Sequence, residues 1–408
     1  MNQRGFTILE VLVGAAVAIL VIGIVMATFL SQQKSMQSMD LSREASNGAR
    51  DSMFSMQGSI GRAGYGVDPR YAFDFKWYNC TTVPCRDKIN GADELVFVER
   101  DPIYYWAGTP TSTTQGCSTD TTAPCTGHAW PVKSFDSATQ MTISADPDDL
   151  FLLGQVVMVT CAKGLQPTMG TIATTIKATS TGNLQLTLTA AVAGNPYKTN
   201  VVTGADPCFG SIYGTAGAGV SMFLVNRYHY LVTIMNGDPW LVLDRGLDYN
   251  QNGTTPENGA DPADYIPIAH GVEDMQIAYL LRPPPSPWPL SGAAPTAPDN
   301  GADWVVGDTV GTVEEPNPSA TAPTQDKPDT DASRYTLHPA NIRGVRVRLM
   351  VRSLLMDHSI DNFAGDAYPA SIENRNDFTA IVLGGYRRYP SSISVATPNL
   401  NSRDPFIF

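Results

Sequence analysis

The chain carries little charge for its length. Only 16% of its 408 residues are Asp, Glu, Lys or Arg, and the net charge is −12. An acidic surface repels phosphate backbones, so we expect no nucleic-acid partner. The 35 glycines and 30 prolines favour turns, strands and loops over a helical bundle. The length suits one elaborated globular region or two.

Recognisable enzyme motifs are also missing. The sequence contains no nucleophile elbow, Walker loop, dinucleotide fingerprint or zinc-protease helix. Adjacent carboxylates such as Asp148 and Asp149 are common in an acidic chain and do not indicate catalysis. We therefore expect that the protein is not an enzyme.

The cysteines show no metal-binding spacing. No C-x-x-C pair occurs and the five histidines are scattered, which disfavours zinc. An even number of cysteines, all downstream of the hydrophobic segment, suits disulfides in an oxidising compartment. The six are Cys80, Cys85, Cys117, Cys125, Cys161 and Cys208. Pairing along the chain is the simplest arrangement, with Cys161 and Cys208 closing the longest loop, but the sequence does not choose among the pairings.

Residues 6–30 form a long apolar run. It has about 25 residues, enough to cross a bilayer as a helix. Arg4, in the short leader 1–5, favours a cytoplasmic N-terminus. A secretory signal peptide would need a small-x-small cleavage site after the run, and residues 28–33 lack one. Glu10 interrupts the run, and a carboxylate in hydrocarbon usually has a dedicated partner.

Residues 5–13, GFTILEVLV, closely resemble the class III signal of type IV pilins and type II secretion pseudopilins. The resemblance implies that prepilin peptidase cuts after Gly5 and methylates Phe6, the first mature residue. It also implies that Glu10 pairs with the N-terminal amine of a neighbouring subunit. Such a pair would turn a costly buried charge into an assembly contact. Glycine at the cut lets a protease approach the backbone closely.

Residues 31–66 continue the helix as an amphipathic segment. Apolar residues recur there at steps of three and four. They are Leu41, Ala45, Ala49, Met53, Met56, Ile60 and Ala63. Gly64 and Gly66 then predict the end of the helix. The sequence RAGY at 62–65 resembles the end of this helix in PilW-type minor pilins and in the J pseudopilin.

Residues 67–408 predict a large β-rich head, so the expected fold class is α+β. Apolar or alternating segments predict strands. They lie at 94–99, 155–160, 184–188, 220–225, 228–235, 240–243, 271–279, 342–351 and 391–395. The segment GVEDMQIAY at 271–279 resembles a strand near the end of PilW proteins, and 386–395 resembles their last strand, with Pro390 as an interruption. Residues 283–331 are rich in proline and predict a long exposed loop.

The segment 248–253 fits the first half of an EF-hand-like calcium loop. Asp248, Asn250 and Asn252 alternate as oxygen ligands before a glycine. Gly259 stands where the twelfth-position glutamate is expected, and Glu257 or Asp261 would substitute only with altered geometry. An Asn- and Gly-rich turn between strands explains the same residues. Both interpretations stay open.

Together these resemblances imply a PilW-like minor pilin of the bacterial inner membrane, with a single span and its head in the periplasm, later built into a pilus. The implied partners are other minor pilins and the major pilin, prepilin peptidase, the assembly platform, a tip adhesin and, before assembly, membrane lipid. The size of the head favours the pilus tip. The alternatives are a J-type pseudopilin of type II secretion and a surface adhesin or binding module on a pilin anchor. An independently folding insert between the first and last cysteines would favour the binding module.

Overall fold

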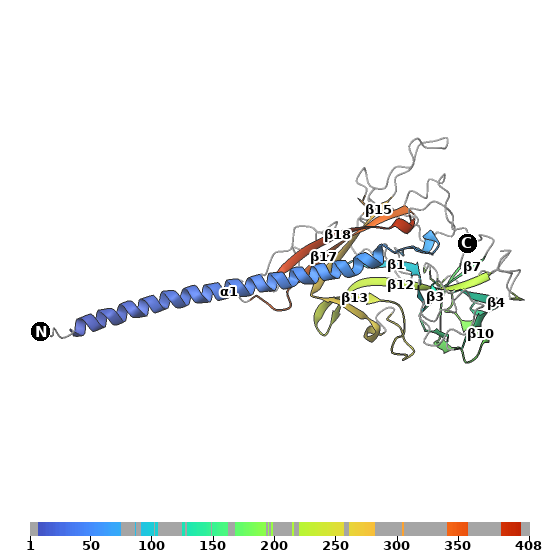
Figure 1. The fold of residues 1–408 in the computed structure, drawn as a ribbon, viewed down its shortest axis with the longest axis horizontal. Coiled ribbons are helices and arrows are strands. Elements are labelled where there is room, and N and C mark those ends of the chain that lie inside the picture. Colours follow the sequence, from blue (N-terminus) through green and yellow to red (C-terminus); the bar gives the residue numbers. More distant parts are fainter. Residues whose placement is uncertain are drawn as a thin grey trace, which may run out of the picture.

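The computed structural model describes most of the chain outside several long loops. The described residues are 7–74, 86, 91–101, 103–104, 125–126, 129–147, 149–161, 168–192, 195, 197–198, 214–215, 220–256, 261–281, 304–305, 341–357 and 385–400. One long N-terminal apolar helix is followed by a large antiparallel β-sheet domain (Figure 1), which confirms the expected fold class.

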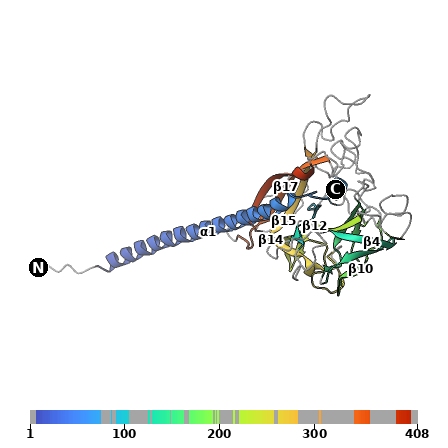
Figure 2. The same ribbon diagram turned by 45° about the vertical axis from the view of Figure 1, so that its right-hand side comes forward.

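The helix α1 (Ile8–Ile60) has 53 residues and spans roughly 80 Å. Its first half projects as a rod and its second half lies along the domain (Figures 1 and 2). Gly64 and Gly66 predicted the helix end, but α1 ends three residues before Ala63, the last residue ahead of these glycines. The backbone N–H of Ala63 bonds to the carbonyl of Ile60 at 3.0 Å, a tighter turn than an α-helix makes. Gly64, with φ +75°, then redirects the chain.

The predicted apolar stripe of α1 is the face that meets the domain. All seven stripe residues are at most 7% exposed, which confirms the periodicity argument. Gly48 also lies on this face, where an added Cβ would sit 3.7 Å from Val351. Most of the intervening residues are exposed, Phe54 to 80%, but Ser52 is buried and its hydroxyl donates to the Gly48 carbonyl.

The part of the domain that packs on α1 is called the proximal lobe here. It contains a four-stranded antiparallel sheet in the order β16-β15-β17-β18. Its elements are β15 (Val272–Leu281), β16 (Trp304–Val305), β17 (Ile342–Arg352) and β18 (Arg388–Ala396). A second layer comes from β1 (Leu95–Arg100), β13 (Asp238–Asp244) and β14 (Ile266–His270). The aromatic rings of Phe97 and Tyr228 stack at 5.0 Å within the shared core.

A second hydrophobic core defines the distal lobe, at the end of the molecule opposite the N-terminus (Figure 1). It is built on β4 (Trp130–Ser137), β5 (Gln140–Ala145), β7 (Val156–Cys161), β8 (Thr168–Thr171) and β10 (Gly182–Thr187). Trp130 and Phe151 are fully buried and meet edge to face at 5.2 Å. A third, smaller cluster with Val96, Met158 and Phe223 fills the space between the lobes.

The strand β12 (Val220–Met235) runs through both lobes. Its first half pairs with β7 and β4, and its second half pairs with β1 and β13. The sequence predicted two separate strands here, at 220–225 and 228–235, and this prediction was wrong because a single strand covers both. Asn226 and Arg227 stay in register opposite Glu99 and Val98, so pairing with β1 carries the strand across its polar middle.

The remaining described elements are short. They are β2 (Ile103–Tyr104), β3 (Cys125–Thr126), β6 (Leu150–Phe151), β9 (Ile176–Lys177), β11 (Gly214–Thr215), and the 3-10 helices η1 (Pro69–Tyr71), η4 (Pro262–Asp264) and η9 (Pro398–Leu400). The other predicted strands exist with ends shifted by a few residues. Apart from β16, the proline-rich segment 283–331 lies outside the described residues.

Candidate functional site

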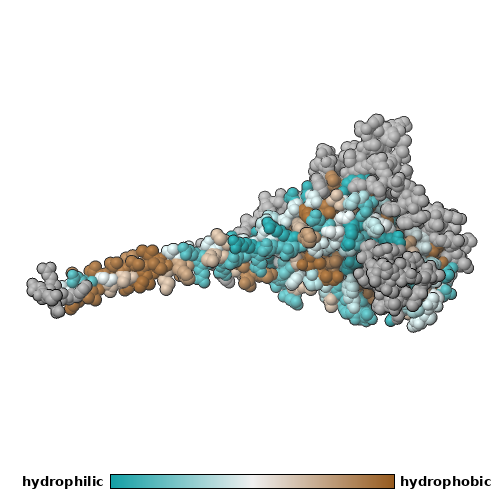
Figure 3. Space-filling model, in the orientation of Figure 1, coloured by the Kyte–Doolittle hydropathy of each residue, from teal (hydrophilic) through white to brown (hydrophobic). Residues whose placement is uncertain are grey.

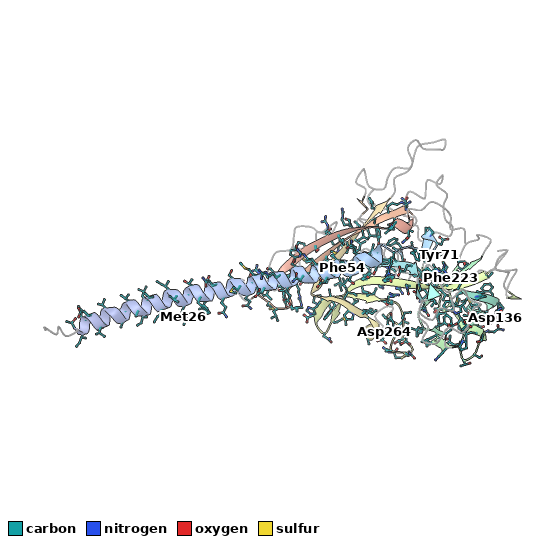
Figure 4. The ribbon with its side chains drawn as sticks, viewed as in Figure 1. Met26, Phe54, Tyr71, Asp136, Phe223 and Asp264 are labelled. Carbon is teal, nitrogen blue, oxygen red and sulfur yellow. The ribbon has the colours of Figure 1, made fainter. Side chains whose placement is uncertain are left out.

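Nothing in the described part of the chain covers the first half of α1. An 18-residue window of this helix has a mean hydropathy of 2.9 and is 0% buried. Among the described residues it is the one helix long and apolar enough to cross a membrane. Figure 3 shows it as a band of hydrophobic side chains, and Met26, labelled in Figure 4, is 59% exposed. Such a surface needs lipid or other helices around it.

Glu10 lies in the first turn of this exposed stretch and closes a capping box with Thr7. The backbone N–H and the hydroxyl of Thr7 both donate to Glu10 Oε2, each at 3.0 Å. The N–H of Glu10 donates back to the Thr7 hydroxyl oxygen at 3.3 Å. The pattern T-x-x-E at 7–10 carried the signal for this motif. The carboxylate therefore has partners within its own helix turn, through one of its two oxygens.

Two residues of the resemblance fall outside the described part of the chain. They are Gly5 and Phe6, the implied cleavage and methylation positions, and both assignments stay predictions. They stand directly before Thr7, which caps the helix. The implied new N-terminus would thus lie within one turn of Glu10 along the chain.

The second half of α1 presents two different faces. The stripe described above is buried against the proximal lobe, while Met36, Met39 and Phe54 are 67%, 58% and 80% exposed. Asp40 and Arg43 form a solvent-exposed ion pair at 3.8 Å, which adds little stability. A helix with one face docked and apolar residues on the other can still pack against further helices.

The cysteine side chains lie outside the description. Cys80, Cys85, Cys117 and Cys208 are not described at all, and for Cys125 and Cys161 only the backbone is placed, on β3 and β7. The three bridges therefore stay predictions.

The predicted calcium ligands sit in the loop after β13. Asp248 is 1% exposed, and its two carboxylate oxygens accept the backbone N–H groups of Asn252, at 3.0 Å, and Gly253, at 2.8 Å. Asn250 Oδ1 accepts the same Asn252 N–H at 3.0 Å. These are turn contacts, as the simpler interpretation expected.

Asp261, which the sequence offered as a substitute ligand, returns to this loop. Its Oδ2 accepts the side-chain amides of Asn250, at 2.9 Å, and Asn252, and the hydroxyl of Thr254 at 3.2 Å. Its Oδ1 accepts the N–H of Ala263 at 3.0 Å and caps η4. These hydrogen bonds, led by that from Asn250, lower the pKa of the Asp261 carboxyl.

Asp264 is a third carboxylate at the loop, and the sequence analysis missed it. Its Oδ1 accepts the backbone N–H groups of Tyr249 and Asn250, both at 3.1 Å. Its Oδ2 is buried and has no hydrogen-bond partner in the described part of the chain. Burial, and then the negative charges of Asp261 and Asp248, raise the pKa of Asp264 above its usual value. Asp248, Asp261 and Asp264 thus all accept hydrogen bonds from the same short segment, 249–253.

The loop is not a ready-made metal centre. Within the described residues, no three or more His, Cys, Asp or Glu side chains are already gathered so that they could hold an ion. Glu257 and Gly259, named in the sequence argument, lie outside the described residues. What the structure brings together is a set of carboxylates and amides in one hydrogen-bonded loop.

Comparisons with known proteins add little. No protein-family model and no curated protein matches the sequence. Among solved structures, a type IV-like pilin from Thermus thermophilus is similar, at 15% sequence identity over 43% of this chain and 69% of that chain. The TM-score is 0.20, so this likeness carries no argument about fold or function.

A buried charge network joins β12 and β13 to the segments around β1. Arg86 contacts Asp74 at 2.9 Å and Glu94 at 2.7 Å. His229 lies between Glu94, at 2.9 Å, and Asp244, at 3.1 Å. No sequence signal marked this network, because its members come from separate segments.

Within this network, Asp244 has a strongly shifted pKa. Burial alone would raise it, but the hydrogen bond from His229 and the charges of Arg227 and His229 outweigh burial and lower the pKa to about 2. The network is a buried polar support for the proximal lobe, since Asp74, Arg86, Glu94, His229 and Asp244 are each at most 8% exposed.

Proposed function

We propose that the protein is a PilW-type minor pilin that takes part in assembling or initiating a type IV pilus. The observation that supports this most is the division of α1 into two halves. The first half is exposed, apolar and interrupted by one carboxylate, and the second half is docked on a β domain. A plain membrane anchor needs neither Glu10 nor a docked continuation of the same helix.

The proposed mechanism is non-covalent. Prepilin peptidase would cut after Gly5 and methylate Phe6, and α1 would hold the subunit in the inner membrane with the head in the periplasm. The assembly platform would then move α1 from lipid into a bundle of other pilin helices, where Glu10 pairs with a neighbour's terminal amine. Thr7 satisfies one oxygen of Glu10 until then, which lowers the cost of that carboxylate in the membrane.

The size of the head supports a position at or near the pilus tip. The proximal lobe lies along the second half of α1, and the distal lobe, with its own core, extends beyond the end of the helix (Figure 2). A bulky head fits poorly between neighbouring subunits of a shaft and fits well at an end. Other minor pilins, the major pilin and a tip adhesin are the proposed neighbours, with no catalytic activity and no nucleic-acid partner.

Two alternatives remain in view. A J-type pseudopilin of type II secretion would use the same helix and the same glutamate. A pilin-anchored binding module is favoured by one observation: the distal lobe has its own core and falls between Cys80 and Cys208 for most of its length. That lobe would then carry a ligand site beyond the assembly role.

Mass spectrometry and fibre labelling test the proposal together. The protein from its native membrane should begin at Phe6, with a methylated terminus, and sheared pili should contain it. Gold-labelled antibody against the head should mark fibre ends. An N-terminus after residue 28 would refute the pilin assignment, because it would identify an ordinary signal peptide. Labelling along the whole shaft would refute the tip position alone.

A further inference from the structure

We propose that the loop formed by Asp248, Asp261 and Asp264 binds a calcium ion, and that the bound ion holds this loop against the distal lobe. This goes beyond the pilin assignment and does not depend on it. The argument rests on the charges of the loop, on one unsatisfied oxygen, and on where the loop sits between the lobes.

The first step is the charge balance. Asp248, Asp261 and Asp264 are 1%, 6% and 3% exposed. In the described part of the chain none of them forms an ion pair with a Lys, Arg or His side chain. Carboxylates removed from water are normally paired with cations or coordinate a metal. Three such groups at one loop leave an excess negative charge that a divalent cation would balance.

The second step is the unsatisfied oxygen of Asp264. Its Oδ1 is held by two backbone N–H groups of the loop, Tyr249 and Asn250. The carboxyl group therefore faces the loop, and its other oxygen, the buried Oδ2, has no hydrogen-bond partner there. A buried acceptor without a partner is costly, and few occur in native proteins. A cation at the loop would supply the missing partner.

The third step is the set of amides around Asp261. In the structure the amide nitrogens of Asn250 and Asn252 point at Asp261 Oδ2. The amide oxygens of the same two residues accept the backbone N–H groups of Asn252 and Thr254, so a cation would have to displace the amide nitrogens from Asp261 Oδ2 while these turn contacts stay in place. Amide orientation follows the hydrogen-bond network and changes with the charge at its centre. Asp261 Oδ2 is therefore the oxygen whose hydrogen-bond partners a bound cation would change.

The ligand chemistry selects calcium. All the candidate ligands are carboxylate, amide, hydroxyl or backbone oxygens, which hard cations prefer. No His or Cys side chain belongs to the set, which disfavours zinc. A loop that must rearrange around its ion suits calcium, since calcium accepts six to eight oxygens in flexible geometry and magnesium demands a near-ideal octahedron.

The fourth step is the position of the loop. The N–H of Asp248 donates to the carbonyl of Leu153, which precedes β7 of the distal lobe, at 3.1 Å. Gly154, with φ +85°, packs so closely on Gly246 that an added Cβ would run into the Gly246 carbonyl. Thr255 also lies beside Gly154. An ion that stiffens the loop would therefore stiffen the junction of the two lobes.

The test is thermal unfolding of the full chain in detergent micelles, with calcium chloride, magnesium chloride or a chelator. For a site half-saturated near 1 mM, about 10 mM calcium should raise the melting temperature by roughly 2 °C. The informative variant is Asp264→Asn, which keeps an acceptor for Tyr249 and Asn250 but loses the charge. It should melt at or above the wild-type temperature in chelator and show no calcium shift.

Asp136→Asn is the matched control. Asp136 also accepts several side-chain hydrogen bonds, but it lies on β4 of the distal lobe, far from Asp264 (Figure 4). Its calcium shift should equal that of the wild type. Asp248→Ala is a poor choice, because it removes the acceptor of two backbone N–H groups and would damage the turn itself.

Hydrogen exchange tests the second half of the proposal. Calcium should slow exchange in peptides covering 246–256 and 150–156, and leave β4 and β5 unchanged. Equal wild-type melting in calcium and chelator would overturn the site, as would an equal shift in Asp264→Asn. Equal shifts with magnesium would overturn the choice of calcium. A melting shift without slower exchange at 150–156 would overturn the coupling to the distal lobe. Fibre incorporation is not measured here, so none of these results bears on the pilin assignment.

Discussion

The docking of α1 can be tested with two positions six residues apart on one helix. Ile60 is 0% exposed and belongs to the core of the proximal lobe, whereas Phe54 is 80% exposed. Ile60→Ala should lower the free energy of unfolding by about 2–5 kcal/mol, because it removes buried methyl groups and leaves a cavity. Phe54→Ala should change it by less than about 0.5 kcal/mol, although the deleted side chain is larger.

Urea unfolding of the full chain in micelles, followed by near-ultraviolet circular dichroism, measures both values in one assay. The signal reports the packed aromatic residues of the head and not the lipid-facing half of α1. A Phe54→Ala loss as large as that of Ile60→Ala would mean that α1 docks through a different face. If the exposed face of α1 contacts neighbouring helices, Phe54→Ala should reduce recovery of a correctly folded subunit in sheared fibres. Its effect on recovery should then exceed that of Ile60→Ala, the reverse of the order in stability.

Three further predictions concern single groups. Glu10→Ala should leave the protein in the membrane but reduce its recovery in sheared pili, and wild-type recovery would remove the assigned role of Glu10. Asp244 has a folded pKa of about 2, below its usual 3.8, so its stabilisation is complete above pH 3.8 and is lost as the pH falls through 2. It amounts to about 2 kcal/mol, and the acid loss of stability measured by urea titration should be smaller in Asp244→Asn. Non-reducing peptide mapping should find three bridges including Cys161 with Cys208, and free thiols in exported protein would contradict this.

The long helix was predictable because its signals are local. Apolar length identifies the first half and the step of three and four identifies the docked face of the second half, without reference to the rest of the chain. The three-residue error at the helix end has a local cause too. The residues after Ile60 continue to turn, but their backbone hydrogen bonds span three residues and not the four of an α-helix. Hydrophobic periodicity does not reveal this change.

β12 shows what local signals miss. The polar pair Asn226 and Arg227 interrupts an apolar pattern and suggested a break between two strands. In the fold, β1 lies opposite this pair, and Arg245 donates to the Asn226 side chain at 2.6 Å. Partners distant in sequence therefore supply the hydrogen bonds that keep the strand continuous across this pair. Tertiary pairing overrides local propensity in this way most often in sheets.

The cation loop was predictable only in part. Asp248, Asn250 and Asn252 follow one another at the spacing of a known loop, so the sequence identified them together. Asp264 is the last residue of the 3-10 helix η4, which Asp261 caps, and it meets the loop only after the chain has turned back. Nothing in its neighbourhood distinguishes it from other aspartates of an acidic chain. Its importance comes from burial and from an oxygen without a partner, which only coordinates reveal.

The sharing of β12 decides how the distal lobe can be studied. Val220, Met222 and Leu224 at the start of β12 belong to the distal core, while Tyr228 and Tyr230 on the same strand belong to the proximal core. Deleting residues 129–219 would expose Val220, Met222 and Leu224 and would remove β7, the strand that pairs with this part of β12. We therefore expect such a deletion to aggregate and to lose pilus incorporation, whatever the lobe does.

Substitution on the outer face of the distal lobe avoids this problem. Asn183 on β10 is exposed, and Asn183→Lys leaves both cores and every strand pairing in place. If the lobe binds a surface ligand through this face, the variant should enter pili normally but adhere less well, as measured by cell attachment at equal pilus number. If incorporation and attachment fall together, the face serves assembly instead. Because β12 ties the lobes into one folded unit, only a change of this kind separates binding from assembly.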